Sequence, residues 1–479
     1  MNYPNTLRFP GLMLLVIVSA AACTAPTSGL YASLQEARLV TDGDIPNDSG
    51  VFGFAVDPQN RLHVAAGSWY VQSDVTWQGL TEESTSPPST VTGQLPLSGE
   101  SPLQMSGVVS TDAGLFALLV NPASAQGALY YTSHAQVDAL LQEEEPSLEP
   151  TIWDSVALDV SSLAFGEVLS GLWGVEDGAG NDLLVLQFRT APGVSPAQYE
   201  LASLSPPSDP TSGSFAVAGF GPGEADPASI GSWESVIHDP DGNRLLALNP
   251  FGVYASGAGV ALGSFSELAD LPSLATGEQF SAVAAARNGP DRYLVLGDST
   301  GAIHLSTDGG ISWSSSLPFS PREADSSSEL ELITDGDPDN DPGSGEIRAL
   351  GVSVLQVQDP DGTDALEDVP VILAAWQGRG LGVLAIPALA SGITDAIAVD
   401  PPGNYGSAAD LRFASVNRLT ALNPFDSEDA VIVASTDGNG LWRAAVSVPS
   451  DSGETELITV DIDRDDTDEL VSAVEWFRE

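Results

Sequence analysis

The chain has 479 residues, of which 42% are hydrophobic and 7% aromatic, so it can bury a large core or several smaller ones. Its formal net charge is −51, and it contains no lysine, so all its basic residues apart from histidine are arginines. A charge of this size keeps the protein soluble and excludes nucleic acid and anionic membranes as electrostatic partners. Two explanations stay open: a hydrated acidic surface suited to saline or alkaline surroundings, or an acidic face for cations or a basic partner.

The first residues predict export. Residues 2–8 are polar with one positive charge, and residues 11–20 form an apolar run that is too short to span a bilayer. Small residues then precede Cys23, the only cysteine of the chain. The pattern resembles the bacterial lipobox, in which the cysteine is lipidated and becomes the first mature residue. The alternative is an ordinary signal peptide with Cys23 incidental.

These observations divide the chain into three parts. We expect a lipoprotein signal peptide at residues 1–22, a tether of small residues at 23–35, and one domain at 36–479. Thr24 follows the cysteine where an Asp would indicate inner-membrane retention in some bacteria, so the outer membrane or cell surface is favoured over the inner membrane.

The domain is predicted to be nearly all β, with short strands separated by frequent turns, because the chain has 48 glycines and 34 prolines. Residues 55–67 alternate apolar runs around a Pro-Gln-Asn turn, as two neighbouring strands would. A glycine followed by an apolar or aromatic pair recurs along the chain, at Gly67, Gly114, Gly171, Gly252, Gly301, Gly380 and Gly440. Seven occurrences predict a β-propeller of seven four-stranded antiparallel blades, with six to eight blades left open. Closure is expected to pair a strand near residues 37–41 with the last blade.

The irregular spacing of these glycines predicts long polar loops between strands, at residues 81–101, 201–224 and 318–345, with an acidic loop near residues 143–149. Helical periodicity is confined to residues 136–145 and the end of the chain. No break with a change of composition on each side marks a second domain.

Residues 293–313 contain the clearest single motif. An apolar run ends in a Gly-Asp-Ser-Thr-Gly turn, a second run follows, and residues 306–313 read STDGGISW. This octapeptide resembles the Asp-box of BNR repeats, which lies at strand-to-strand turns of sialidase-like β-propellers. The resemblance implies a structural role for Ser306, Asp308, Gly310, Ser312 and Trp313, because Asp accepts hydrogen bonds from its own turn and Gly adopts positive φ.

The sequence shows no established catalytic set. The four histidines, at 63, 134, 238 and 304, have no metal-binding spacing, and the chain has no P-loop and no nucleophile elbow. The resemblance would imply three arginines around a carboxylate in a sialidase, but no Arg is followed by Ile-Pro or Leu-Pro. Arg61, Arg244, Arg292 and Arg418 lie at turn-to-strand edges and are predicted to be surface residues of the blades.

Two acidic stretches are candidate Ca²⁺ sites, because alternating carboxylates on a tight loop can supply the oxygens that calcium prefers. The first resembles EF-hand and FG-GAP loops and contains Asp461, Asp463, Asp465 and Glu469, although Asp466 replaces the usual Gly. The second contains Asp337, Asp339 and Asp341. A solvated acidic hairpin is the alternative in both cases.

The expected function is that of a lipid-anchored, extracytoplasmic β-propeller that binds a protein or glycan at the bacterial cell envelope without catalysis. Catalytic and cofactor residues are not predicted, apart from the possible calcium ligands. The alternative is a glycoside hydrolase of sialidase-like or xyloglucanase-like type, since a pair of carboxylates would suffice for that chemistry.

Overall fold

In the computed structural model, the described residues are 50–72, 90–98, 101–142, 151–163, 168–176, 180–191, 195, 197–207, 209–220, 231–239, 244–250, 252–256, 265–314, 322–324, 330–332, 346–358, 367–377, 380–386, 397–398, 416–422, 431–436, 440–445, 457–460, 469–472 and 475–478. The chain divides into two units, Met1–Asp42 and Gly43–Glu479, and all described residues lie in the second. The predicted signal peptide, Cys23 and residues 37–41 lie outside the described residues. In the described part, no helix has the length and apolar character needed to cross a membrane.

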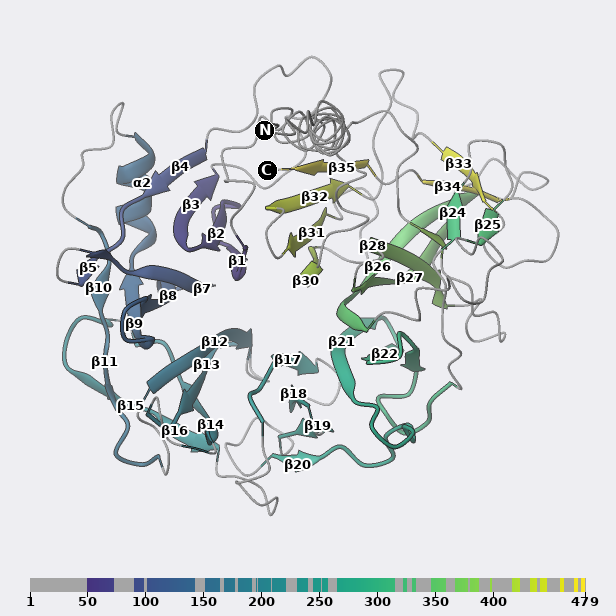
Figure 1. Cartoon of the computed structure of the whole chain (residues 1–479). Helices are drawn as coiled ribbons and strands as arrows, with labels where there is room; N and C mark the ends of the chain where they lie inside the picture. The colour runs from purple at the N-terminus through teal and green to yellow at the C-terminus, as the bar shows by residue number, and fades with distance from the viewer. Residues whose placement is uncertain are drawn as a thin grey trace, which may run out of the picture. The chain divides into compact units, whose positions relative to one another are not determined.

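The prediction of an all-β structure made of antiparallel sheets is confirmed. The described strands can be divided into seven groups that follow one another along the chain, and Figure 1 labels most of these strands. Groups 2 and 3 belong to one eight-stranded sheet, because β9 also pairs with β12. Group 1 is β1 (Gly53–Val56), β2 (Leu62–Ala66), β3 (Ser68–Gln72) and β4 (Thr90–Gly93). Group 2 is β7 (Gln104–Thr111), β8 (Gly114–Asn121), β9 (Gln126–Thr132) and β10 (Asp154–Ser155). Group 3 is β12 (Val168–Glu176), β13 (Asp182–Arg189), β14 (Tyr199–Leu204) and β16 (Ala218–Phe220).

The remaining groups repeat this order. Group 4 is β17 (Ser235–Asp239), β18 (Arg244–Asn249), β19 (Gly252–Ala255) and β20 (Ser266–Glu267), and group 5 is β21 (Phe280–Asn288), β22 (Asp291–Asp298) and β23 (Ile303–Ser306). Group 6 is β26 (Ile347–Gln358), β27 (Glu367–Trp376), β28 (Gly380–Ala385) and β29 (Ile397–Ala398), extended by β24 (Arg322–Ala324), β25 (Leu330–Leu332), β33 (Leu457–Val460) and β34 (Glu469–Ser472). Group 7 is β30 (Val416–Leu422), β31 (Val431–Thr436), β32 (Leu441–Ala445) and β35 (Glu475–Arg478).

Minor elements lie in the connections. These are the short pair β5 (Leu97–Ser98) and β6 (Ser101–Pro102), the parallel pair β11 (Ala157–Asp159) and β15 (Ser214–Ala216), and the helix α2 (His134–Gln142). The helix overlaps the segment in which helical periodicity was predicted. The segments predicted as polar loops contain short strands, because β4 and β16 complete groups 1 and 3 from within them.

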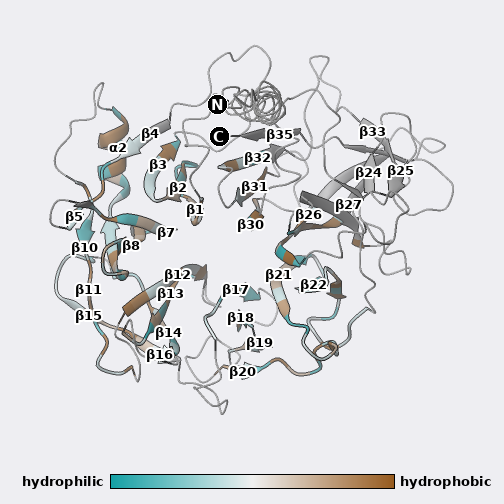
Figure 2. Cartoon of the chain, viewed as in Figure 1, coloured by the Kyte–Doolittle hydropathy of each residue, from teal (hydrophilic) through white to brown (hydrophobic). Residues whose placement is uncertain are grey.

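The second strand of each group is buried on both faces. Strands β8, β13 and β18 are almost continuous apolar runs, GLFALLVN, DLLVLQFR and RLLALN, and most of their side chains are buried. A strand with one solvated face would alternate apolar and polar residues instead. Each group is therefore a layer covered by a neighbour on either side. Figure 2 shows hydrophobic residues, coloured brown, on strands such as β12 and β21.

Separate hydrophobic clusters join successive groups. Buried residues of groups 1 and 2 meet around Trp69 and Met105, and those of groups 2 and 3 meet around Phe116 and Leu184. The same pattern joins group 3 to group 4, group 4 to group 5, and group 5 to group 6. Strand β26 then contacts β30, where a Cβ on Gly351 would lie 3.7 Å from Leu419.

The last group also packs against the first. Val431, Val433 and Leu441 share a hydrophobic cluster with Phe54 and Leu62. The Val51 backbone N–H donates to the Thr436 carbonyl at 3.0 Å. Group 7 is thus in direct contact with group 1. The fourth strand of group 7 is β35, which pairs with β32.

Candidate functional site: the first-strand cavity

The first strands of groups 2 to 7 line one cavity of about 840 Å³. Its lining includes residues of β7, β12, β17, β21, β26 and β30 together with Phe52, which directly precedes β1. We call it the first-strand cavity. The lining residues come from segments that lie far apart in the sequence, between Phe52 and Ala421.

A β-bulge lies at the beginning of the first strand in groups 2, 3, 5, 6 and 7, and groups 1 and 4 have a related hydrogen-bond pattern there. Register shifts occur at Met105/Gly107, Leu169/Gly171, Phe280/Ala282, Ile347/Ala349 and Val416/Arg418. In group 1, the Phe52 N–H donates to the carbonyl of Ala65, which also faces Gly53, and in group 4 the Glu234 N–H donates to the carbonyl of Leu248, which also faces Ser235. A bulge places two residues opposite one and turns the extra side chain away from the regular alternation.

The extra residues form a set with one member per group, and all seven line the cavity: Phe52, Ser106, Ser170, Glu234, Ser281, Arg348 and Asn417. We call them the bulge residues. Their side chains are exposed or half-buried, whereas the residue before each one in groups 2 to 7 is buried. Bulges of this kind occur beside functional sites because they re-aim side chains. The residue types at these seven positions share no pattern from which the bulge residues could be predicted.

The bulge residues are mainly hydrogen-bonding groups. Ser170 Oγ donates to the Gln187 carbonyl at 3.3 Å and accepts from Gln187 Nε2 at 3.1 Å. The Asn417 side chain donates to the Val51 carbonyl at 3.0 Å, so it also helps to join groups 7 and 1. Phe52 differs from the others because it is an apolar ring with 57% of its surface exposed. A cavity with polar groups and an exposed aromatic ring suits ligand recognition.

Three charged side chains line the cavity among the described residues: Glu234, Arg348 and Arg418. Arg348 Nη2 lies 3.0 Å from a carboxylate oxygen of Glu346 and 3.2 Å from Gln377 Oε1. Burial and the nearby charge of Glu346 raise the pKa of Glu234 above its ordinary value, and Arg348 opposes this effect only in part. Glu234 is therefore easier to protonate than an ordinary glutamate.

Arg418 follows the bulge residue of β30, at a position where the other first strands have small residues. The equivalent residues are Gly53, Gly107, Gly171, Ser235, Ala282 and Ala349. A Cβ on Gly53 would lie 3.6 Å from Arg418 Nη1, so the guanidinium reaches across to β1. The guanidinium carbon lies 5.1 Å from the centre of the buried Phe54 ring. Surrounding protein lowers the pKa of Arg418 from its ordinary value, but an arginine stays charged.

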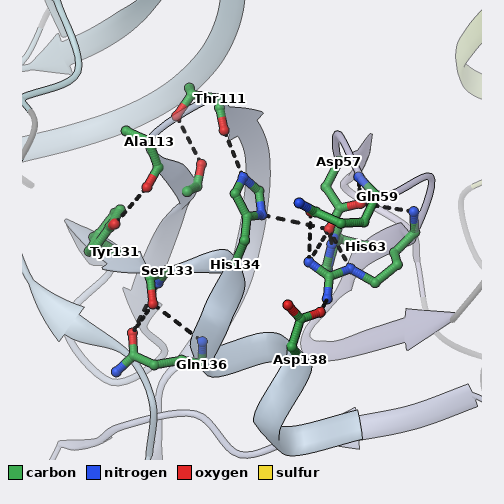
Figure 3. Close-up of polar contacts among 12 residues, drawn as sticks. Asp57, Gln59, His63, Thr111, Ala113, Tyr131, Ser133, His134, Gln136 and Asp138 are labelled. Carbon is green, nitrogen blue, oxygen red and sulfur yellow. Dashed lines mark hydrogen bonds and ion pairs between the residues drawn. The ribbon is translucent and has the colours of Figure 1, made fainter.

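A second polar constellation lies between the β1–β2 turn and α2, and Figure 3 shows it. Asp57 is fully buried, and its Oδ2 lies 2.5 Å from Arg61 Nε and 3.0 Å from His63 Nε2. His134 Nδ1, from α2, lies 3.7 Å from the same oxygen, and Asp138 of α2 forms an ion pair with Arg61. The constellation thus connects the turn to the helix.

The pKa values in this constellation follow from burial and from the Asp57 charge. Burial alone would raise the pKa of Asp57, but contacts with His134, His63 and the Arg61 backbone hold it far below its ordinary range. Burial lowers the pKa of His63, whereas the Asp57 carboxylate raises that of His134. Because Asp57 and His63 are both inaccessible to solvent, the constellation is suited to holding the structure together.

The same turn recurs in group 5. Asp298 Oδ1 accepts from the backbone N–H groups of Thr300 and Ala302, and its Oδ2 lies 3.0 Å from His304 Nε2. In group 1, Asp57 Oδ1 accepts in the same way from the second and fourth residues that follow it. The sequence signal is an Asp six residues before a His that follows Leu or Ile, and this signal was missed.

The Asp-box residues form a local hydrogen-bonded turn after β23. Asp308 accepts from the backbone N–H groups of Ile311 and Ser312 and from Ser312 Oγ, at 3.1, 2.9 and 2.6 Å. Those bonds lower the pKa of Asp308 to about 2. The Gly310 N–H donates to Ser306 Oγ at 2.8 Å with φ of 93°, and Trp313 packs against the cluster between groups 4 and 5. The turn holds its own loop and does not line the first-strand cavity.

The other predicted site residues have no described side chains. Asp461, Asp463, Asp465, Asp337, Asp339 and Asp341 lie outside the described residues, and Glu469 is described only as the first residue of β34. Within the described part of the chain, no three or more His, Cys, Asp or Glu side chains are grouped so as to hold a metal ion.

The prediction that four arginines are surface residues is wrong for Arg61, whereas Arg418 is exposed. Arg61 is 3% exposed because Asp57 and Asp138 pair with it, and Arg418 faces the first-strand cavity. Arg244 is only partly buried and pairs with Asp239, and Arg292 is exposed, as predicted. An arginine after a turn has the same sequence signature whether its side chain points outward or into a cavity.

Comparisons with known proteins give no family. No protein-family model and no curated protein matches the sequence. Among solved structures, the extracellular domain of a one-component system from B. thetaiotaomicron has 10% identity and a TM-score of 0.44, with 88% of this chain and 40% of that one covered. Raptor from Chaetomium thermophilum has 12% identity and a TM-score of 0.41, with 91% and 29% covered. The chain thus spans less than half the length of either protein.

Proposed function

We propose that the Gly43–Glu479 unit is a seven-bladed β-propeller that binds a ligand, protein or glycan, in its central cavity without converting it. The observation that carries the proposal is the first-strand cavity, to which each of the seven groups contributes one bulge residue. Support for the propeller comes from the hydrophobic clusters that join each group to the next and group 7 to group 1. The Asp-box resemblance agrees with it.

We further propose that the protein is anchored in the cell envelope, at the outer membrane or cell surface, by a lipid on Cys23. The motif around Cys23 supports this anchor. In the native bacterium, the protein should fractionate with membranes and incorporate labelled fatty acid, and a Cys23→Ala variant should do neither. A native protein that carries no fatty acid would contradict the anchor and leave the binding role unaffected.

A panel of polysaccharides and envelope proteins tests the binding role. We expect the purified protein to bind at least one of them by isothermal titration calorimetry, and a Phe52→Ala variant to bind it more weakly. Ile311→Ala is the matched control, because Ile311 is 73% exposed and lies in the Asp-box turn, away from the cavity. Equal losses for both variants would place the ligand elsewhere than in the cavity.

A glycoside hydrolase is the second candidate, and it is favoured by the raised pKa of Glu234 in the cavity. Such enzymes need a protonated acid together with a second carboxylate, and Glu346 is near enough for its charge to affect Glu234. Reducing-sugar release from the same panel separates the candidates. Turnover that Glu234→Gln abolishes would replace the binding role with catalysis.

Calcium binding by the two acidic stretches stays a proposal. If Asp461, Asp463, Asp465 and Glu469 bind Ca²⁺, the melting temperature of the protein should fall when a chelator is added and recover when Ca²⁺ is restored. An unchanged melting temperature, together with no heat of Ca²⁺ binding, would reject both stretches as sites.

A further inference from the structure

Charge in the first-strand cavity is opposite to charge in the rest of the molecule. The whole chain has 15 basic and 66 acidic residues, yet the described lining of the cavity has two arginines and one glutamate. The described lining therefore has one more basic than acidic side chain, in a strongly acidic protein.

Of the two arginines that line the cavity, Arg418 is the one that has no carboxylate counterion among the described residues. Arg348 has Glu346 as its counterion, at 3.0 Å. For Arg418, in contrast, the described residues provide the Phe54 ring and no carboxylate within ion-pair distance. An anion that enters the cavity would supply the counterion that Arg418 lacks among the described residues.

The geometry of Arg418 defines the kind of anion. The Phe54 ring lies 5.1 Å from the guanidinium carbon, which fixes the position of the group. The N–H donors of a guanidinium lie in its own plane, as a fork that matches two oxygens of one carboxylate, sulfate or phosphate group. The hydroxyl group of Ser281 lines the same cavity, has no hydrogen-bond partner among the described residues, and can donate to a further oxygen.

The remaining negative charge of the protein does not prevent binding. At physiological ionic strength, exposed charges are screened over about 8 Å, so surface carboxylates act weakly on a group inside the cavity. Interactions inside the cavity are screened less and dominate there.

We propose that the first-strand cavity is an anion site in which Arg418 binds a carboxylate, sulfate or phosphate group of a small ligand. This inference rests on the proposed binding function and adds to it the chemical class of the group that enters the cavity. Arg418 would contact the oxyanion directly, and the bulge residues would bind the neutral polar parts of the ligand.

Isothermal titration of the full-length protein with citrate, glucuronate, sulfate and inorganic phosphate, each in a zwitterionic buffer, tests the site. We expect one-to-one binding of at least one probe with a Kd below about 10 mM. The carboxylate arms and the inorganic arms show which source of oxyanion is preferred. A protein that binds none of the four in this range overturns the proposal.

Substitutions locate the bound anion. Arg418→Gln should weaken binding by at least about tenfold, because a charge-assisted pair of hydrogen bonds is lost. Arg287→Gln is the matched control, since Arg287 is an exposed residue of β21 outside the cavity lining. If Arg418→Gln does not fold, Arg418→Lys is the variant to test. It keeps the positive charge but lacks the paired N–H donors of the guanidinium, so it should still bind the anion more weakly than the native protein. Native affinity in either folded variant would overturn the assignment.

The inference and the broader function can fail separately. A neutral saccharide that binds the native protein and Arg418→Gln equally, with no probe anion bound, would refute the anion site and leave the binding function standing. Probe anions bound through Arg418, with no polysaccharide or protein bound, would support the anion site and remove the broader function.

Discussion

Replacing Asp57 by Asn should destabilise the protein far more than the same change at Asp298, although the two turns have the same backbone hydrogen bonds. Asn retains Oδ1, which accepts from the backbone in both turns. It replaces Oδ2 by an NH₂ group, which is a donor. The difference between the two sites therefore depends on what faces Oδ2.

At Asp298, Oδ2 faces His304, whose ring can change tautomer and accept a hydrogen bond from the new amide. The cost there should be about 1 kcal/mol. At Asp57, Oδ2 also faces Arg61, which cannot become an acceptor and is only 4% exposed. Breaking a buried ion pair from one side costs about 3–5 kcal/mol, and the second contact of Arg61 with Asp138 favours the lower end of that range.

Urea or guanidinium unfolding followed by circular dichroism measures both variants, provided that the slope of the transition is unchanged. A loss of about 3 kcal/mol is a large part of the stability of most proteins, so the Asp57→Asn midpoint should shift clearly. Equal destabilisation at the two sites would refute the reasoning, because it would mean that the buried Arg61 does not need its carboxylate.

Three further predictions concern other parts of the fold. Asp308→Ala should lower the melting temperature at neutral pH, and the deficit should shrink as the pH falls from 3.8 through about 2, because the native carboxylate becomes protonated over that range. A deficit of the same size at pH 2 as at neutral pH would count against the Asp308 hydrogen bonds. His134→Gln should lower the stability of the protein most below pH 6.5, and progressively less as the pH rises through the raised pKa of His134. Melting curves between pH 6 and 9 measure this difference. A loss of stability that does not change with pH would contradict an ionic role of His134. Gly114→Ala should lower the free energy of unfolding by at least about 3 kcal/mol, and Gly180→Ala by about 1 kcal/mol, in the same unfolding assay. Both glycines have positive φ, but only at Gly114 would a Cβ meet a backbone oxygen, at 2.5 Å. Similar losses for the two variants would show that the crowding at Gly114 relaxes.

The sequence predicts the kind of structure better than the place of each residue in it. Frequent turns and short apolar runs are enough for an all-β structure, and helical periodicity locates α2 to within a few residues. The glycine motif is less informative. Gly252 begins a third strand, but Gly114 begins the second strand of group 2 and Gly171 lies in the first strand of group 3. Seven occurrences accompany seven groups although they mark different strands.

Local sequence fails to fix strand position because pairing partners lie elsewhere in the chain. Residues 244–248 and 418–422 read RLLAL and RLTAL, yet the first segment lies in a second strand and the other in a first strand. The arginine pairs with Asp239 in one case and faces the cavity in the other. The positions of the bulge residues are equally hard to predict from sequence, since Ser, Glu, Arg, Asn and Phe occupy equivalent positions.

The hydrogen bond between Asn417 and Val51 spans 366 residues, and it lies where group 7 meets group 1. The apolar face of the first group, with Phe54 and Leu62, must therefore wait for a partner that is synthesised near the end of the polypeptide. Until then that apolar face is exposed to solvent and can aggregate with other chains. A nascent or translocating chain would need protection by a chaperone over that interval, and premature truncation before residue 431 should yield insoluble material.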